Sequence, residues 1–303
     1  MSKNKPIKAK KVNTDKDLDQ FFTKTTIAQH CIDIAKEYLS TNESTLFIEP
    51  SAGSGSFSLL LGDNVLALDL EPQHTSIIKC DFLLFDINEH YKDKTIPTSD
   101  TIVVEGNPPF GKRGKLAKQF IDKAITFSDS IAMILPMNFI KWEMQNKIDS
   151  NYSLIYQEIL DPNSFTFKNK DYSVRTAFQI WTKKETTYPN LRIQKKPDVT
   201  HPDFELFLYN NTPETLKFFD KNTYRWNFAV VRQGYNDYTK FITNENELLK
   251  TKQWIFFKTK TKKVLKRLQS IDYTKLSLKN TSTPGFGKAD IIEAYTQKYG
   301  SSS

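Results

Sequence analysis

The stretch Thr45-Leu46-Phe47-Ile48-Glu49-Pro50-Ser51-Ala52-Gly53-Ser54-Gly55 decides the fold. It begins with an apolar run that predicts a buried strand, and it ends in a glycine-containing turn before a helix expected from Ser56. Such a turn lets the backbone approach a ligand closely and points the N–H groups of the helix start toward it. The third glycine of a dinucleotide-binding fingerprint is missing, which argues against a nicotinamide enzyme.

Strands and helices alternate around this stretch. Further strands are predicted at 65–70, 77–83, 101–104 and 130–135, and helices at 25–39 and 116–127. This alternation indicates an α/β fold, with a mostly parallel sheet that helices cover on both faces. Segments 153–160 and 174–181 are expected to pair as a hairpin, which adds one antiparallel strand.

The 303 residues are enough for one catalytic domain and a smaller appended one. We expect a basic flexible tail over 1–17, a catalytic domain over 18–186 and a smaller C-terminal domain over 187–303, where the sequence becomes aromatic and Lys-rich. No run is apolar enough for a membrane span, and the N-terminus lacks the apolar stretch of a secretory signal. We therefore expect a cytoplasmic protein without membrane contact.

The net charge of +8 favours a polyanionic partner such as nucleic acid, although biased genome composition also enriches a chain in Lys. Its distribution is more informative, because residues 251–270 carry seven Lys or Arg and no Asp or Glu. The two cysteines and four histidines are scattered, so neither a disulfide framework nor a metal site is expected.

Two acidic residues lie at the ends of predicted strands. Asp69 comes twenty residues after Glu49, where a carboxylate can accept hydrogen bonds from ribose hydroxyls. Asp81 ends the next strand, where it can receive an adenine amine while the ring of Phe82 covers the base. The alternatives are a solvated strand end for Asp69 and a surface Asp beside a core Phe for the second pair.

The most specific signal is Val103-Val104-Glu105-Gly106-Asn107-Pro108-Pro109-Phe110-Gly111. Two prolines after a buried strand cannot donate to a sheet, so they form a rigid, extended turn with free carbonyls. An adenine amine is a poor nucleophile because its lone pair is delocalised into the ring. If the Asn107 side-chain oxygen and the Pro108 carbonyl each accept one amine hydrogen, the nitrogen becomes tetrahedral and its lone pair points at a sulfonium methyl. Phe110 supplies a ring for the base to stack on.

With these motifs in this order, residues 19–184 resemble the class I S-adenosylmethionine-dependent N6-adenine methyltransferases. Their signatures are an acidic-Pro-x-x-Gly-x-Gly loop and an Asn-Pro-Pro-aromatic motif. The resemblance implies a Rossmann-like sheet, S-adenosylmethionine as cofactor, methylation of a flipped-out adenine at N6, and target recognition by residues 187–303. The implied catalytic residues are Asn107, Pro108, Pro109 and Phe110. The implied cofactor-binding residues are Phe21, Thr23, Glu49, Pro50, Gly53, Gly55, Asp69, Asp81, Phe82 and Asn107.

DNA is the favoured substrate because residues 19–23 resemble the N-terminal Phe-Tyr-Thr segment of bacterial and phage DNA adenine methyltransferases, with Phe22 where Tyr is frequent. By the same resemblance Phe165, with Phe167 as second choice, stacks on the flipped base; each can also be a core ring. Phosphate contacts are expected from basic residues of the C-terminal domain: Arg225, Arg232, Lys258, Lys262 and Lys263. Methylation of RNA adenine, methylation of a protein glutamine and a non-catalytic binding subunit are the alternatives.

Overall fold

The structure, a computed structural model, describes residues 21–300 except 93, 94, 96, 169 and 280–282, so the tail expected over 1–17 lies outside the described residues. The described residues form two compact units. The first contains those up to Pro136 together with Lys147–Arg192, and the second contains Met137–Asn146 and those from Ile193 onward. Among the described residues, no helix is both long enough and apolar enough to cross a membrane.

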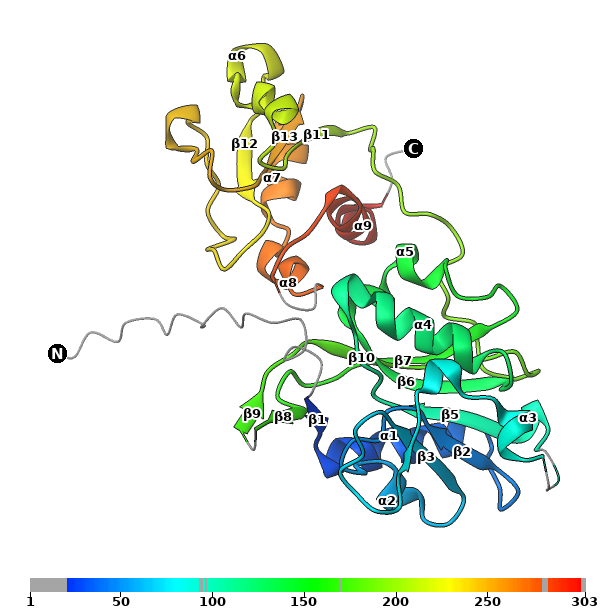
Figure 1. Cartoon of the computed structure of the whole chain (residues 1–303). Helices are drawn as coiled ribbons and strands as arrows, with labels where there is room; N and C mark the ends of the chain where they lie inside the picture. Colours follow the sequence, from blue (N-terminus) through cyan, green and yellow to red (C-terminus); the bar gives the residue numbers. More distant parts are fainter. Residues whose placement is uncertain (1–20, 93–94, 96, 169, 280–282, 301–303) are drawn as a thin grey trace. The chain divides into compact units, whose positions relative to one another are not determined.

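A seven-stranded sheet forms the centre of the first unit (Figure 1). Its order is β4-β3-β2-β5-β6-β10-β7, formed by Ile78–Lys79, Val65–Asp69, Leu46–Glu49, Ile102–Gly106, Ser130–Pro136, Thr176–Thr182 and Ser153–Ile159. Strands β4 to β6 are parallel, whereas β10 runs antiparallel to both β6 and β7. The predicted Rossmann-like sheet with one antiparallel strand is confirmed.

Helices bury the faces of this sheet, as a parallel sheet requires. Helix α1 (Thr25–Tyr38) places Cys31 and Ala35 in a core cluster with Phe47 and Val103 of the sheet. Helix α4 (Lys115–Ala124) lies on the other side in Figure 1 and buries one apolar stripe of its own. Two short helices complete the unit: α2 (Ser58–Leu61) and α3 (Ile87–His90).

Two parts of the first unit differ from the prediction. The strand expected over 77–83 is only two residues long, because the Asp81 carboxylate accepts the Leu83 N–H and starts a 3-10 helix, Phe82–Leu84. Between β7 and β10 the chain forms an additional hairpin of β8 (Phe165–Phe167) and β9 (Lys170–Tyr172), and β8 pairs with β1 (Phe22–Thr23). This second small sheet was not predicted.

The second unit is built on the antiparallel sheet β11-β13-β12, formed by Phe204–Tyr209, Trp254–Thr259 and Phe228–Val231. Its helices are α5 (Trp142–Gln145), α6 (Lys221–Tyr224), α7 (Lys262–Gln269), α8 (Tyr273–Ser277) and α9 (Lys288–Tyr299). Aromatic rings dominate its core, including Trp226, Phe256 and Tyr273. The aromatic residues of this region therefore serve mainly its own packing.

Candidate active site

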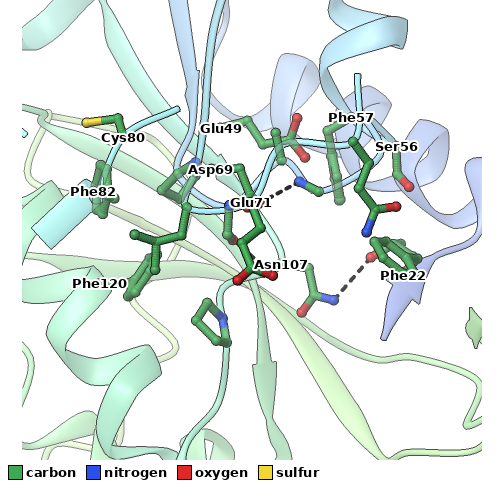
Figure 2. Close-up of a pocket in the computed structure, with 18 of the residues that line it drawn as sticks. Phe22, Glu49, Ser56, Phe57, Asp69, Glu71, Cys80, Phe82, Asn107 and Phe120 are labelled. Carbon is green, nitrogen blue, oxygen red and sulfur yellow. Dashed lines mark hydrogen bonds between the residues drawn. The ribbon is translucent and has the colours of Figure 1, made fainter. Parts of the chain in front are cut away.

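A pocket of about 360 Å³ lies at the carboxyl ends of β2, β3 and β5, the edge at which open α/β sheets bind ligands (Figure 2). All of the predicted cofactor residues except Gly55 line it. It is also lined by residues that were not predicted: Phe22, Ser51, Ala52, Ser56, Phe57, Leu70, Glu71, Gln73, Cys80, Leu116 and Phe120. The residues of the predicted motifs thus lie together in one pocket. Their neighbours in the sequence and residues of helix α4 form the rest of its lining.

The turn after β2 has a shape that favours glycine at two positions. Gly53 has a φ of +52°, and a Cβ there would lie 3.0 Å from Cε1 of Phe22. Gly55 has a φ of +90°, and its Cβ would lie 2.9 Å from Cγ of Leu59. L-residues are strained at such φ values, and both contacts are closer than carbon atoms normally approach. Gly53 therefore lets the backbone form one wall of the pocket against the Phe22 ring.

Asp69 at the end of β3 fixes this turn. One carboxylate oxygen accepts the Gly53 N–H at 2.7 Å, and the other accepts the Glu71 N–H at 2.7 Å. A carboxylate oxygen has two lone pairs, so each still has one for a further donor. Asp69 therefore joins the turns after β2 and β3 and keeps acceptor capacity in the pocket.

Two buried glutamates lie behind the glycine turn. The Glu49 carboxylate is almost fully buried and accepts the Ser58 N–H at 2.8 Å, at the start of α2. The parallel register pairs Ile48 with Val104, so Glu49 and Glu105 are neighbours on adjacent strands. Burial raises the pKa of Glu49 to about 8 and raises that of Glu105 well above its usual value, and repulsion from the other carboxylate adds to the shift of Glu105. Glu49 thus supports the turn as well as lining the pocket.

Aromatic side chains form one end of the pocket. In Figure 2, Cys80, Phe82 and Phe120 lie at this end, Asp69 and Glu71 lie in the middle, and the Phe22 ring lies at the other end. The rings of Phe82 and Phe120 stack with centroids 5.3 Å apart. Phe120 belongs to α4, where its helical spacing predicts a core position but gives no sign of a pocket.

Asn107 follows β5 and lines the pocket, and both its side-chain nitrogen and its backbone carbonyl form hydrogen bonds. Its Nδ2 donates to the Thr23 hydroxyl at 3.2 Å, and its backbone carbonyl accepts from the Ser51 hydroxyl at 3.0 Å. Its Oδ1 is buried and has no partner among the described residues. An unsatisfied buried acceptor is costly, so this oxygen is suited to receive an N–H donor from a ligand. Pro109 also lines the pocket.

The aromatic residues predicted to stack on a base lie in a packed cluster. Phe165 is fully buried and Phe110 is 6% exposed. Both rings contact the ring of Phe21 edge to face, at centroid distances of 5.0 and 5.1 Å. Phe167 is only half-buried, and the Lys168 ammonium lies 5.1 Å from its ring centroid. In this conformation Phe167, rather than Phe165, has a partly exposed ring.

The five basic residues predicted to contact phosphate all lie in the second unit, but they differ in exposure and in their partners. Arg232 is half-buried and donates to the Phe286 carbonyl and to two side-chain oxygens, so its guanidinium is used within the unit. Lys258 forms a 2.8 Å ion pair with Glu205. Arg225, Lys262 and Lys263 are exposed.

The pocket residues fit S-adenosylmethionine. The volume of the pocket lies in the range of small-molecule sites. The rings of Phe82 and Phe120 lie at one end of it and the ring of Phe22 lies at the other. Asp69 offers acceptors to ribose hydroxyls, and the ring of Phe82 can cover an adenine. The turn at Gly53 lies against the Phe22 ring, at the end opposite Phe82.

The family model of the EDM2 methyltransferase-like domain matches residues 46–206, just over half of the chain. No curated protein sequence shows a significant match.

Similar solved structures include a Pyrococcus horikoshii protein classed as an RNA methyltransferase, with 19% identity, a TM-score of 0.42, and coverage of 59% of this chain and 94% of that one. A type I restriction-modification methyltransferase subunit from Streptococcus thermophilus has 16% identity, a TM-score of 0.41, and coverage of 57% and 47%. An S-adenosylmethionine-dependent methyltransferase from Anabaena variabilis has 12% identity, a TM-score of 0.37, and coverage of 60% and 100%. The chain belongs to the EDM2 methyltransferase-like domain family, with the fold and the S-adenosylmethionine cofactor of the class I methyltransferases.

Proposed function

We propose that the protein transfers a methyl group from S-adenosylmethionine to the N6 amine of an adenine in DNA, after that adenine has left the base stack. The observation that carries the proposal is the state of the Asn107 side chain. Its nitrogen is held by Thr23, whereas its buried oxygen has no partner among the described residues. An exocyclic amine, which has two N–H groups on a planar nitrogen, is the donor that this acceptor suits.

The residues of the turn act by positioning. S-adenosylmethionine supplies an electrophilic methyl group on a sulfonium when it is bound. The Asn107 oxygen accepts one amine hydrogen and the Pro108 carbonyl accepts the other, which turns the nitrogen lone pair out of the plane of the base. The prolines keep these two acceptors at fixed positions, so little reorganisation is needed as charge develops on the nitrogen.

The substrate class depends on features outside this turn. Exposed Lys262 and Lys263 on α7 support a polyanionic substrate and disfavour a protein glutamine, whose amide has similar hydrogens. Phe22 and Thr23, which belong to the segment that resembles DNA adenine methyltransferases, both line the pocket. The lysines favour nucleic acid of either kind, and the segment with Phe22 and Thr23 favours DNA; RNA is the alternative outcome of the test.

The test is incubation of the full chain with methyl-labelled S-adenosylmethionine and separate pools of single-stranded DNA, duplex DNA and RNA. We expect label in a DNA pool, at adenines that share a sequence context. Label in RNA alone would assign RNA as the substrate. Label in no nucleic acid pool would contradict the proposed function.

A further inference from the structure

Asn107 is held by two hydroxyl groups from segments far apart in the sequence. We propose that Thr23 and Ser51 are positioning residues, which determine the atoms of Asn107 that face the reacting amine. This inference builds on the proposed function and adds two roles to it. From sequence Thr23 was expected to bind the cofactor, and Ser51 was not singled out.

The Thr23 hydroxyl holds one end of the Asn107 carboxamide and leaves the other end without a partner among the described residues. The two ends have nearly the same shape, but one is an acceptor and the other a donor. Because the Nδ2 group donates to Thr23 Oγ1, the acceptor Oδ1 is left for the ligand. A reversed carboxamide would present its N–H groups to the hydrogens of the target amine and could not accept them.

The position of Thr23 is itself fixed by backbone pairing. Thr23 is buried in β1, where it is registered opposite Phe165 of β8. The next residue, Lys24, donates its N–H to the Ser164 carbonyl at 3.0 Å. The hydroxyl therefore depends on the small sheet that β8 and β9 form, so this sheet helps to orient the catalytic amide.

Ser51 acts on the backbone of the same residue. Its hydroxyl donates to the Asn107 carbonyl at 3.0 Å from the turn after β2. This carbonyl belongs to the peptide that joins Asn107 to Pro108, so the contact fixes the plane of that peptide. The direction of the Pro108 carbonyl, the second proposed acceptor, then varies little, because the Pro108 ring fixes its φ and the following Pro109 restricts its ψ.

The experiment compares Thr23→Val, which keeps the shape and removes the hydroxyl, with Thr23→Ser, which keeps the hydroxyl. Thr45→Val is the matched control, since Thr45 is also buried and its hydroxyl accepts one hydrogen bond, from the Asn42 N–H in the turn that precedes β2. We expect T23V to lower kcat roughly tenfold or more, the equivalent of about one lost hydrogen bond. Any rise in the Kd for S-adenosylmethionine in T23V should be smaller than its fall in kcat, T23S should recover most of the rate, and T45V should resemble wild type.

A second readout requires neither cofactor nor substrate. In protein labelled with [15N]asparagine, the side-chain amide signal of Asn107 can be assigned by its loss in Asn107→Ala. We expect T23V to shift this signal and to speed the exchange of its protons with water. T23S and Ser51→Ala should leave it close to its wild-type position, although S51A should also lower kcat.

The outcomes separate the two proposals. If T23V weakens cofactor binding as much as it lowers kcat, or leaves kcat and the Asn107 signal unchanged, the positioning role of Thr23 is overturned. Unchanged kcat in S51A overturns the role of Ser51. If the wild-type protein methylates no nucleic acid, the proposed function fails, and the asparagine signal alone then decides whether Thr23 holds the Asn107 amide.

Discussion

Replacing Gly53 by alanine should weaken cofactor binding as well as destabilise the fold. At a φ of +52° an alanine costs about 1–2 kcal/mol relative to glycine. The new Cβ would also lie 3.0 Å from Cε1 of Phe22, so either the ring or the turn must move. Movement of the turn would strain the hydrogen bond from the Gly53 N–H to Asp69, which is worth about 1 kcal/mol.

Gly62 provides a matched control. Its φ is +73°, but a Cβ there would meet nothing within 4 Å, and it does not line the pocket. Urea denaturation should show that G53A lowers the free energy of unfolding by about 1–2 kcal/mol. G62A should lower it by at least as much, because the ψ of −136° at Gly62 lies outside the left-handed helical region. Calorimetry with S-adenosylmethionine should show a Kd about tenfold higher in G53A, from roughly 1.4 kcal/mol of lost binding, and no change in G62A. Wild-type affinity in G53A would refute the role assigned to this turn.

Three further predictions concern charged groups. Because burial raises the pKa of Glu49 from 4.5 to about 8, the folded protein keeps a proton that the unfolded chain loses. The free energy of unfolding should therefore fall as the pH rises through this interval, and urea titrations of E49Q should show a smaller slope. The double substitution of Lys262 and Lys263 by alanine should weaken nucleic acid binding and reduce the slope of log Kd against log salt by about 2. K258A should reduce this slope by less than about 0.9, the value for one phosphate contact, because the Lys258 ammonium is already paired with Glu205. Arg232→Met should lower the free energy of unfolding by about 2 kcal/mol, because partly buried acceptors at Phe286 and Gln253 lose their donor. It should leave the nucleic acid affinity of the folded protein unchanged, and a selective loss of affinity would support a phosphate contact instead.

The sequence predicted best the features that depend on local backbone chemistry. The apolar runs that become β2, β3, β5 and β6 are long enough to read directly, and Gly53 and Asn107 lie where these strands end. Ligand sites of open α/β sheets lie at that edge, so motif order and strand order together locate the pocket. The place of Phe120 in the pocket was not predicted. Helical spacing distinguishes a buried face from an exposed one, but it does not show whether a buried residue lies in the core or lines a pocket.

Other features depend on contacts between distant residues and could not be read from the sequence. The strands of the β1-β8-β9 sheet have two or three residues each, too few for a periodic pattern. The burial of Phe165 follows from that sheet, because β1 brings Phe21 against its ring. From its basic sequence neighbours Arg232 was predicted to contact phosphate, but its hydrogen bonds to Phe286 and Gln253 depend on the fold. The grouping of Met137–Asn146 with residues from Ile193 onward likewise depends on long-range packing.

The central claim is that Asn107 directs methylation to the N6 amine of adenine. It is tested most directly by mass spectrometry of nucleosides from DNA incubated with wild-type protein or with Asn107→Ala, alongside calorimetry of S-adenosylmethionine binding. The wild-type product should be N6-methyldeoxyadenosine. The variant should lose activity by roughly a hundredfold or more and bind the cofactor nearly as well as wild type. Undiminished methylation by the variant, or a methyl group at another position of the nucleoside, would contradict the claim.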